Sequence, residues 1–277
     1  MKKWNLIIDV AKCFDCNNCF LSCKDEFDGN DFPPYSLAQP RHGQRWMNIM
    51  RKERGQYPLI DIAYRPTLCM HCDDAPCISK ADGAIYKRDD GIVLVDLEKA
   101  KDRKDLVDVC PYGAIWWNEE KAIPQMCTFC VHLLEDGWDK PRCVQACPTG
   151  ALSVVQAEDS EMAEIVKSEN LEVLHPEYNT KPRVYYKNLY RYSKCFIAGN
   201  VALKDTDECA EGAKITLNKG SEKGIATAEV NNYGDFRIDN LDEEGGQYTV
   251  EIEYSGYEKQ ELSVDLKNSI SLGTIFL

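Results

Sequence analysis

The C-terminal part of the chain alternates between apolar and polar positions over two short stretches. Residues 248–254 carry Tyr, Val, Ile and Tyr at every second position, and residues 262–266 carry Leu, Val and Leu in the same way. A period of two is typical of strands that bury one face. Turn-forming sequences bracket these stretches at residues 232–235, 244–246 and 255–257. The pattern predicts a small all-β sandwich over residues 195–277.

The pattern further upstream predicts one helix and one irregular segment. Residues 160–175 place Ile165, Val166 and Leu171 on one side of a helix. Residues 24–68 contain no cysteine and are interrupted by several prolines. We expect a loop-rich insertion there, with Trp46 and Ile49 as its anchors.

The charge of the chain is unevenly distributed. Of the formal net charge of −13, residues 195–277 contribute −9, from 7 basic and 16 acidic residues, and residues 1–194 contribute the remaining −4. This shift predicts a domain boundary near residue 195. An acidic chain lacks the clustered basic face that binds phosphates, so we expect no nucleic-acid partner. No apolar run approaches the ~18 residues that span a bilayer, so we expect no direct membrane insertion.

Fourteen cysteines carry the chemistry that the sequence suggests. The N-terminus does not read as a secretory signal, so we expect a cytoplasmic protein whose reduced thiols bind metal rather than form disulfides. The first cysteine run has the spacing of bacterial ferredoxins and consists of Cys13, Cys16, Cys19 and Cys23. In such a run three thiolates hold one 4Fe–4S cluster and the fourth reaches a neighbouring cluster.

A partner run and a third group complete the cysteine pattern. The partner run consists of Cys127, Cys130, Cys143 and Cys147. With crossed ligands, cluster 1 takes Cys13, Cys16, Cys19 and Cys147, and cluster 2 takes Cys127, Cys130, Cys143 and Cys23. The remaining four predict the iron ligands of cluster 3, namely Cys69, Cys72, Cys77 and Cys110.

A fourth cluster would need ligands at positions that hold no cysteine. By the same spacing these positions fall at Lys80 or Ala81 and at Ala100, Arg103 and Leu106. All four ligands of this fourth cluster are missing, whereas its expected neighbour, cluster 3, keeps all four of its cysteines. Random loss of cysteines would leave isolated ligands, so the sequence predicts three clusters.

A short repeat indicates a duplicated architecture. Residues 110–115 read Cys-Pro-Tyr-Gly-Ala-Ile, residues 147–152 read Cys-Pro-Thr-Gly-Ala-Leu, and residues 80–85 are a degenerate third copy. Each copy leads through a turn into an apolar strand start. We expect an α+β fold with a double ferredoxin-like module and then the sandwich. Its predicted parts are an outer unit of residues 1–26 and 120–194 with two clusters, an inserted unit of residues 27–119 with one cluster, and the domain of residues 195–277.

The order of the cysteine runs and the Cys-Pro-x-Gly-Ala steps, over residues 1–160, resembles the iron–sulfur electron-transfer subunits of the dimethyl-sulfoxide-reductase family of molybdenum enzymes. The tail resembles a transthyretin-like or carboxypeptidase-regulatory-like sandwich, on cues such as Gly199-Asn200-Val201 and Gly234-Asp235-Phe236. In lacking one cluster and in carrying an added β-domain, the chain resembles the branch of this family that transfers hydroxyl groups between polyhydroxybenzenes.

The resemblance implies a heterodimer or higher complex. A large catalytic subunit would hold the molybdenum bis-pterin cofactor and the active site, and this chain would be its non-catalytic iron–sulfur subunit. One alternative is the electron-transfer subunit of a net reductase or dehydrogenase acting on sulfur compounds, arsenic or formate. A free ferredoxin is a third, disfavoured by the insertion and the extra domain.

Some side chains have simpler explanations. Three structural zinc sites are an alternative use of the twelve cysteines, although zinc prefers separated Cys-x-x-Cys pairs. Cys195 and Cys209 belong to no run, and we expect two ordinary buried thiols. His71, between Cys69 and Cys72, either supports a cluster through a hydrogen bond or is a loop residue that faces solvent or the partner.

Overall fold

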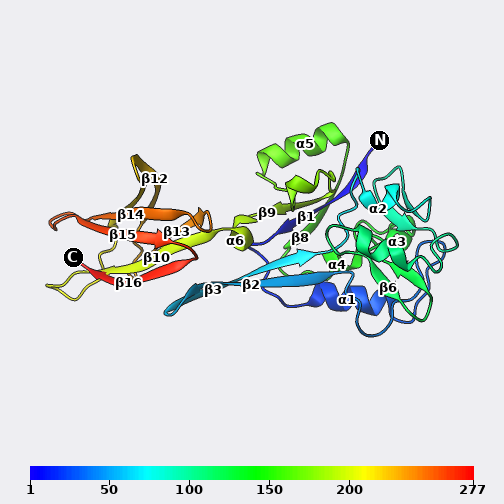
Figure 1. Ribbon diagram of the computed structural model, residues 1–277. Coiled ribbons are helices and arrows are strands. Elements are labelled where there is room, and N and C mark those ends of the chain that lie inside the picture. Colours follow the sequence, from blue (N-terminus) through cyan, green and yellow to red (C-terminus); the bar gives the residue numbers. More distant parts are fainter. The chain divides into compact units, whose positions relative to one another are not determined.

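Strand β1 (Lys3–Asp9) is the centre of a three-stranded sheet in the first half of the protein. A computed structural model describes residues 1–277, and within it β1 pairs antiparallel with β8 (Leu152–Ala157) and parallel with β9 (Val184–Lys187). Figure 1 shows β1 between these two strands. Leu6 and Ile8 on β1 are fully buried because a central strand is covered on both sides.

Short elements surround this sheet and carry most of the cysteine loops. The helices are α1 (Asn18–Phe27), α2 (Pro76–Ser79), α3 (Val131–Glu135), α4 (Arg142–Gln145) and α5 (Asp159–Ser168), with 3₁₀ turns η1 (Lys104–Val109) and η2 (Pro176–Tyr178). Two hairpins are formed by β4 (Ile85–Lys87) with β5 (Val93–Val95), and by β6 (Trp116–Asn118) with β7 (Ile123–Gln125). The three copies of the repeat end at the starts of β4, β6 and β8, as predicted.

The predicted helix over residues 160–175 is shorter than expected. Helix α5 begins as predicted, with a capping box in which Glu158 and Glu161 satisfy each other's free backbone N–H groups. It ends at Ser168, and Asn170 then takes a left-handed conformation with φ 51°. Leu171 therefore lies outside the helix, although it packs with Met162 in the same hydrophobic cluster.

The expectation of a loop-rich segment over residues 24–68 was wrong in its second half. Residues there form a long hairpin of β2 (Asn48–Gln56) and β3 (Leu59–Thr67). Trp46 and Ile49 are buried, which confirms them as anchors. The prolines that suggested a loop, Pro33, Pro34 and Pro40, all lie before the hairpin, so they remove no hydrogen bond from its ladder.

The C-terminal residues form the predicted β-sandwich after a short helix, α6 (Tyr190–Ser193). One sheet has the order β13-β10-β16 and the other has the order β12-β11-β14-β15. Its strands are β10 (Cys195–Ala202), β11 (Lys214–Lys219), β12 (Glu222–Glu229), β13 (Asp235–Leu241), β14 (Gly246–Glu253), β15 (Gln260–Leu266) and β16 (Ile270–Phe276). The predicted alternation is present, because Tyr248, Val250 and Ile252 are buried in one core with Val264 and Leu266.

The chain divides into two compact units, and both of them are discontinuous in sequence. The first unit contains residues 1–50 and 64–189, and the second contains residues 51–63 and 190–277. The outer part of the β2–β3 hairpin thus belongs with the sandwich, whereas the sequence-based division assigned it to the inserted unit. Its Arg54 side chain is buried and forms ion pairs with Asp61 at 2.6 Å and with Asp239 at 3.1 Å.

No helix of the structure is both long enough and apolar enough to cross a membrane.

Candidate iron–sulfur sites

The first cysteine group combines one end of the sequence with a much later loop. Cys13, Cys16 and Cys19 lie at and just before the start of α1, and Cys147 follows α4. Burial, and after it the charges of Cys13, Cys16 and Cys147, raises the pKa of the Cys19 thiol to about 12. The structure therefore brings these four thiols together.

The turn after Cys147 is built to receive a negatively charged sulfur. Gly150 has φ +64°, a conformation that glycine adopts without strain, and the backbone folds around the thiol. Burial alone would raise the pKa of Cys147, but the N–H groups of Thr149, Ala151 and Leu152 and the Thr149 hydroxyl lower it below its ordinary value. Such N–H···S contacts are a main means by which a protein adjusts an iron–sulfur cluster.

The second group lines a small enclosed pocket beneath β1. Cys23 is on α1, Cys143 is on α4, Cys130 immediately precedes α3, and Cys127 completes the set. Burial, and then the charges of Cys130, Cys127 and Cys23, raises the pKa of Cys143 well above its ordinary value. The Gln39 amide also faces the Cys23 sulfur at 4.0 Å, a donor that the sequence analysis did not identify.

The third group lines another enclosed pocket with apolar walls. Cys69, Cys72, Cys77 and Cys110 border it together with Met126, Ile115 and Val93. Burial, and then the charges of Cys110 and Cys72, raises the pKa of Cys77 to about 12. The Thr180 hydroxyl faces the Cys72 sulfur and also contacts the Tyr112 hydroxyl at 2.7 Å.

The second group is a neighbour of both other groups. Cys143 of the second group is close enough to Cys19 of the first for the charge of one thiol to affect the other. Cys69 of the third group is related in the same way to Cys127 of the second. The group of Cys23 is therefore adjacent to the first group and to the third.

The positions expected for a fourth ligand set are filled with apolar packing. Ala81, Ala100 and Leu106 are fully buried, with no exposed surface. The Arg103 guanidinium contacts the Lys80 carbonyl at 3.4 Å and pairs with Asp105. The positions expected for a fourth ligand set are therefore occupied by buried apolar side chains and by a salt-bridged arginine.

His71 is not the solvent-facing loop residue that one interpretation expected. It is only 2% exposed, and its Nδ1 accepts a hydrogen bond from the Val93 N–H at 3.0 Å. Its ring packs edge-on against Phe129, between Cys127 and Cys130. Burial, and then the charge of Lys87, lowers the pKa of His71 to about 3, so it is neutral here.

The two cysteines outside the runs differ from each other. Cys195 is 2% exposed and belongs to the core of the sandwich, as expected. Cys209 is exposed, so the expectation of a buried thiol was wrong for it. It lies in the loop between β10 and β11, where the backbone runs over the surface. All fourteen cysteines are free thiols, without a disulfide between these two.

The donor sets fit a cofactor that is wider than one ion. No three His, Cys, Asp or Glu side chains converge closely enough to hold a single metal ion. The second and third groups instead each present four thiols around a pocket, and in the first group backbone N–H groups are directed at the Cys147 sulfur. Four thiolates are the ligand set of a 4Fe–4S cluster. Burial and mutual repulsion disfavour the negative charge on these thiolates, and the positive charge of the iron would compensate for it.

These features define an iron–sulfur protein of the ferredoxin-like dicluster class with an added β-sandwich. Residues 60–157 match the family model for a 4Fe-4S dicluster domain, and residues 197–272 match the carboxypeptidase regulatory-like domain. The second match confirms the kind of sandwich that the tail suggested.

Comparison with known proteins narrows this class. The chain is 49% identical to the pyrogallol hydroxytransferase small subunit of Pelobacter acidigallici, over 100% of both chains. It is 31% identical to a putative dimethyl sulfoxide reductase iron-sulfur subunit of Halobacterium salinarum, over 68% of this chain and 80% of that protein. It is 32% identical to a tetrathionate reductase subunit of Salmonella typhimurium, over 68% of this chain and 73% of that protein. The chain belongs to the family of iron–sulfur subunits that includes the pyrogallol hydroxytransferase small subunit.

Proposed function

We propose that this chain is the iron–sulfur subunit of a molybdenum hydroxytransferase that acts on polyhydroxybenzenes such as pyrogallol. The observation that carries the proposal is the match to the pyrogallol hydroxytransferase small subunit, which extends over the whole chain and includes the sandwich. The reductase and dehydrogenase subunits match about two thirds of the chain. A net reductase or dehydrogenase subunit is the second candidate, favoured by these more distant relatives.

The proposal includes three 4Fe–4S clusters with crossed ligands. Cluster 1 is assigned to Cys13, Cys16, Cys19 and Cys147, cluster 2 to Cys23, Cys127, Cys130 and Cys143, and cluster 3 to Cys69, Cys72, Cys77 and Cys110. The three convergent thiol groups support this assignment, and the apolar filling around Leu106 supports a count of three.

When bound, the clusters supply one-electron redox sites. The residues of this chain would hold them as neighbours, line two apolar pockets around clusters 2 and 3, and direct backbone N–H groups at the Cys147 sulfur. The chain itself presents no constellation for hydroxyl transfer. We therefore assign the molybdenum bis-pterin cofactor and the catalysis to a large partner subunit, in the reducing cytoplasm that keeps such thiols free.

Anaerobic purification of the native complex tests the proposal. We expect about twelve irons per copy of this chain, from three four-iron clusters, and a large subunit that carries molybdenum. We also expect hydroxyl transfer from a polyhydroxybenzene donor to pyrogallol without an added reductant. Turnover that depends on an external electron donor or acceptor would instead support the reductase or dehydrogenase candidate. Zinc in place of iron would contradict both.

A further inference from the structure

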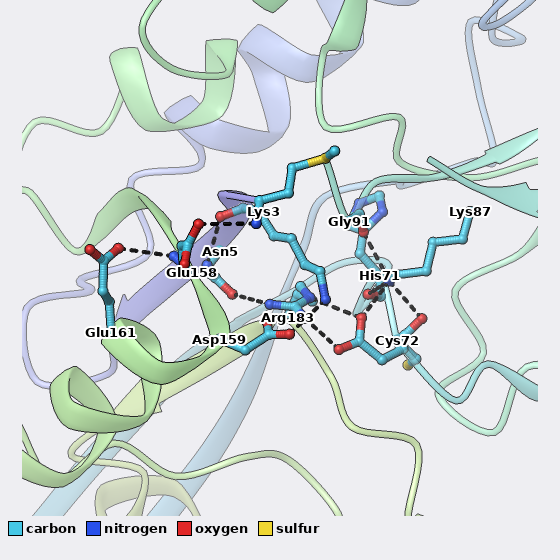
Figure 2. A network of polar contacts seen from close by, with 12 residues as sticks. Lys3, Asn5, His71, Cys72, Lys87, Gly91, Glu158, Asp159, Glu161 and Arg183 are labelled. Atoms are coloured by element: carbon cyan, nitrogen blue, oxygen red, sulfur yellow. Dashed lines mark hydrogen bonds and ion pairs between the residues drawn. The ribbon is translucent and has the colours of Figure 1, made fainter. Parts of the chain in front are cut away.

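Lys87 places a cation against the loop that carries two of the cluster 3 cysteines. Its Nζ donates to the carbonyl oxygens of His71 at 2.9 Å, Cys72 at 2.9 Å and Gly91 at 3.0 Å. It also forms an ion pair with Asp73 at 2.8 Å. Figure 2 shows these contacts converging on the Lys87 nitrogen.

The environment of Lys87 fits the charged ammonium form. An ammonium group has three N–H donors and no acceptor, and four oxygens surround Nζ. A neutral amine would offer only two donors and would leave oxygens without a partner. The side chain is only 20% exposed, so water screens this charge weakly.

One peptide group connects Lys87 to the sulfur of Cys72. The carbonyl of the His71–Cys72 peptide accepts from Lys87, and the N–H of the same peptide faces the Cys72 thiol. The C=O and N–H of a trans peptide point in opposite directions, so a cation on the carbonyl side polarises the N–H toward the sulfur. Lys87 can therefore act on cluster 3 both directly and through this peptide.

The neighbouring carboxylate is shared, so it does not neutralise Lys87. Asp73 also accepts two hydrogen bonds from Arg183, at 2.9 Å and 2.5 Å. Arg183 is buried and contacts Asp159 and Asn5 as well, and Asp159 in turn pairs with Lys3 at the surface. Figure 2 shows this network extending from the cluster loop to β1 and α5. Lys87 and Arg183 are therefore two poorly exposed cations beside this loop, and both contact Asp73.

We propose that Lys87 is a positioning residue that sets the reduction potential of cluster 3 and holds its Cys69–Cys72 loop. The inference rests on the proposed function, because it requires a cluster on Cys69, Cys72, Cys77 and Cys110. Reduction adds one negative charge to a cluster, and a nearby fixed cation stabilises the reduced form. Lys87 thus raises the potential of cluster 3 above the value that the thiols and backbone alone would give.

The test is a potentiometric titration of the complete complex, followed by electron paramagnetic resonance, with Lys87→Met. The midpoint potential of cluster 3 should fall, while those of clusters 1 and 2 should keep their wild-type values. The cluster 3 signal is identified beforehand as the one that Cys77→Ser removes. Lys181→Met is the matched control, because Lys181 pairs with Asp74 of the same loop but is 72% exposed and contacts no loop carbonyl. Its cluster 3 potential should not change.

Three further variants keep the test decisive if Lys87→Met loses cluster 3. Asp73→Asn removes the opposing charge and leaves Lys87 in place, so it should raise the potential of cluster 3. Lys87→Arg retains the charge and should keep the potential closer to wild type than Lys87→Gln does. An unchanged potential in Lys87→Met or Asp73→Asn, in a complex with all three clusters, would overturn the role of Lys87 and leave the proposed function intact. A wild-type complex without a cluster on the Cys69 group would overturn both.

Discussion

Cys13 and Cys147 lie close enough for the charge of one thiol to affect the other, although Cys13 precedes the first helix and Cys147 is the last cysteine of the last run. Burial, opposed by the Asp15 N–H and reinforced by the charge of Cys147, raises the pKa of the Cys13 thiol. This pairing joins the start of the chain to residues that come after the whole inserted unit. It is the contact that the crossed ligand assignment requires, and it makes that assignment open to direct test.

Single serine replacements should identify which cysteines share a cluster. Cys147→Ser should damage the same cluster as Cys13→Ser, and Cys110→Ser should damage the same cluster as Cys72→Ser, because each pair supplies one thiol group. Electron paramagnetic resonance and Mössbauer spectra of the complex provide the measurement. Cys209→Ser is the control and should leave all three signals unchanged, since Cys209 is exposed in the sandwich domain. Cys147→Ser paired instead with Cys130→Ser would contradict the assignment.

Leu106 should stabilise the folded chain through its buried side chain, which occupies a position expected for a ligand of a fourth cluster. Its side chain is fully buried, so Leu106→Ala should lower the free energy of unfolding by about 2–5 kcal/mol. Iron content under native conditions should stay at the wild-type value, because Leu106 does not line the pockets of the second and third cysteine groups. Chemical denaturation under anaerobic conditions measures the first effect, and iron analysis the second.

Leu21→Ala is the matched control for Leu106→Ala. Leu21 is 56% exposed, so the same change in chemistry creates no cavity. We expect an effect within about 0.5 kcal/mol. Equal destabilisation by the two variants would show that the region around Leu106 is not tightly packed.

Asp61 should make the second unit sensitive to acid. Burial would raise the pKa of this carboxyl, but hydrogen bonds from Arg237 and Arg54 and the charges of Arg237 and Arg191 hold it well below its ordinary value of 3.8. A lowered carboxyl pKa stabilises the folded state above the unfolded-state value and loses that contribution as pH falls through the folded-state value. The unit should therefore lose stability below about pH 4.

Asp61→Asn should remove much of that acid dependence. At neutral pH it should also destabilise the unit by about 2–3 kcal/mol, because the buried Arg54 loses one of its carboxylate partners. Urea unfolding of the whole chain, followed by hydrogen exchange in residues 190–277, provides the measurement at pH 7 and pH 3. Asp242→Asn is the control, since the exposed Lys194–Asp242 pair should contribute no measurable stability.

The hairpin tip should depend on the sandwich for its order. Residues 51–63 group with residues 190–277, and Arg54 bonds Asp239 and the Lys194 carbonyl there. Deletion of residues 190–277 should therefore expose the hairpin to protease, whereas the full chain should resist cleavage between Gln56 and Leu59. Mass mapping of the fragments locates the cut. Equal resistance in both chains would mean that the hairpin is stable by itself.

The same deletion tests whether the sandwich docks onto the large subunit. We expect the truncated chain to co-purify with that subunit in reduced yield, because the acidic sandwich is an additional surface beyond the cluster module. Arg54→Met in the full chain is the companion variant, since it loosens the hairpin but keeps the sandwich. Full yield with the deletion would contradict the docking role.

Much of the candidate site follows from sequence because cluster loops are local structures. The x2-x2-x3 spacing around Cys13, the glycine at position 150 and the repeat at Cys110 each determine a turn within a few residues. The crossed pairing is a prediction from the same spacing. Period-two alternation predicted the sandwich because strand burial is also a local pattern, in which every second side chain faces the core.

Other features could be seen only in the tertiary structure, because they join distant segments and no sequence pattern indicates that these segments contact each other. Nothing around Lys87 marks it as the partner of the His71 and Cys72 carbonyls, which a lysine reaches only after β4 pairs with β5 and the loop folds over it. The hairpin at residues 51–63 reads as a proline-flanked insertion, and Asp239 and Arg237 decide that it belongs to the sandwich. The sequence by itself determined the cysteine loops and the strand pattern, through local geometry. Only the tertiary structure decided the buried charges around those loops, because burial of a charge requires partners from distant segments.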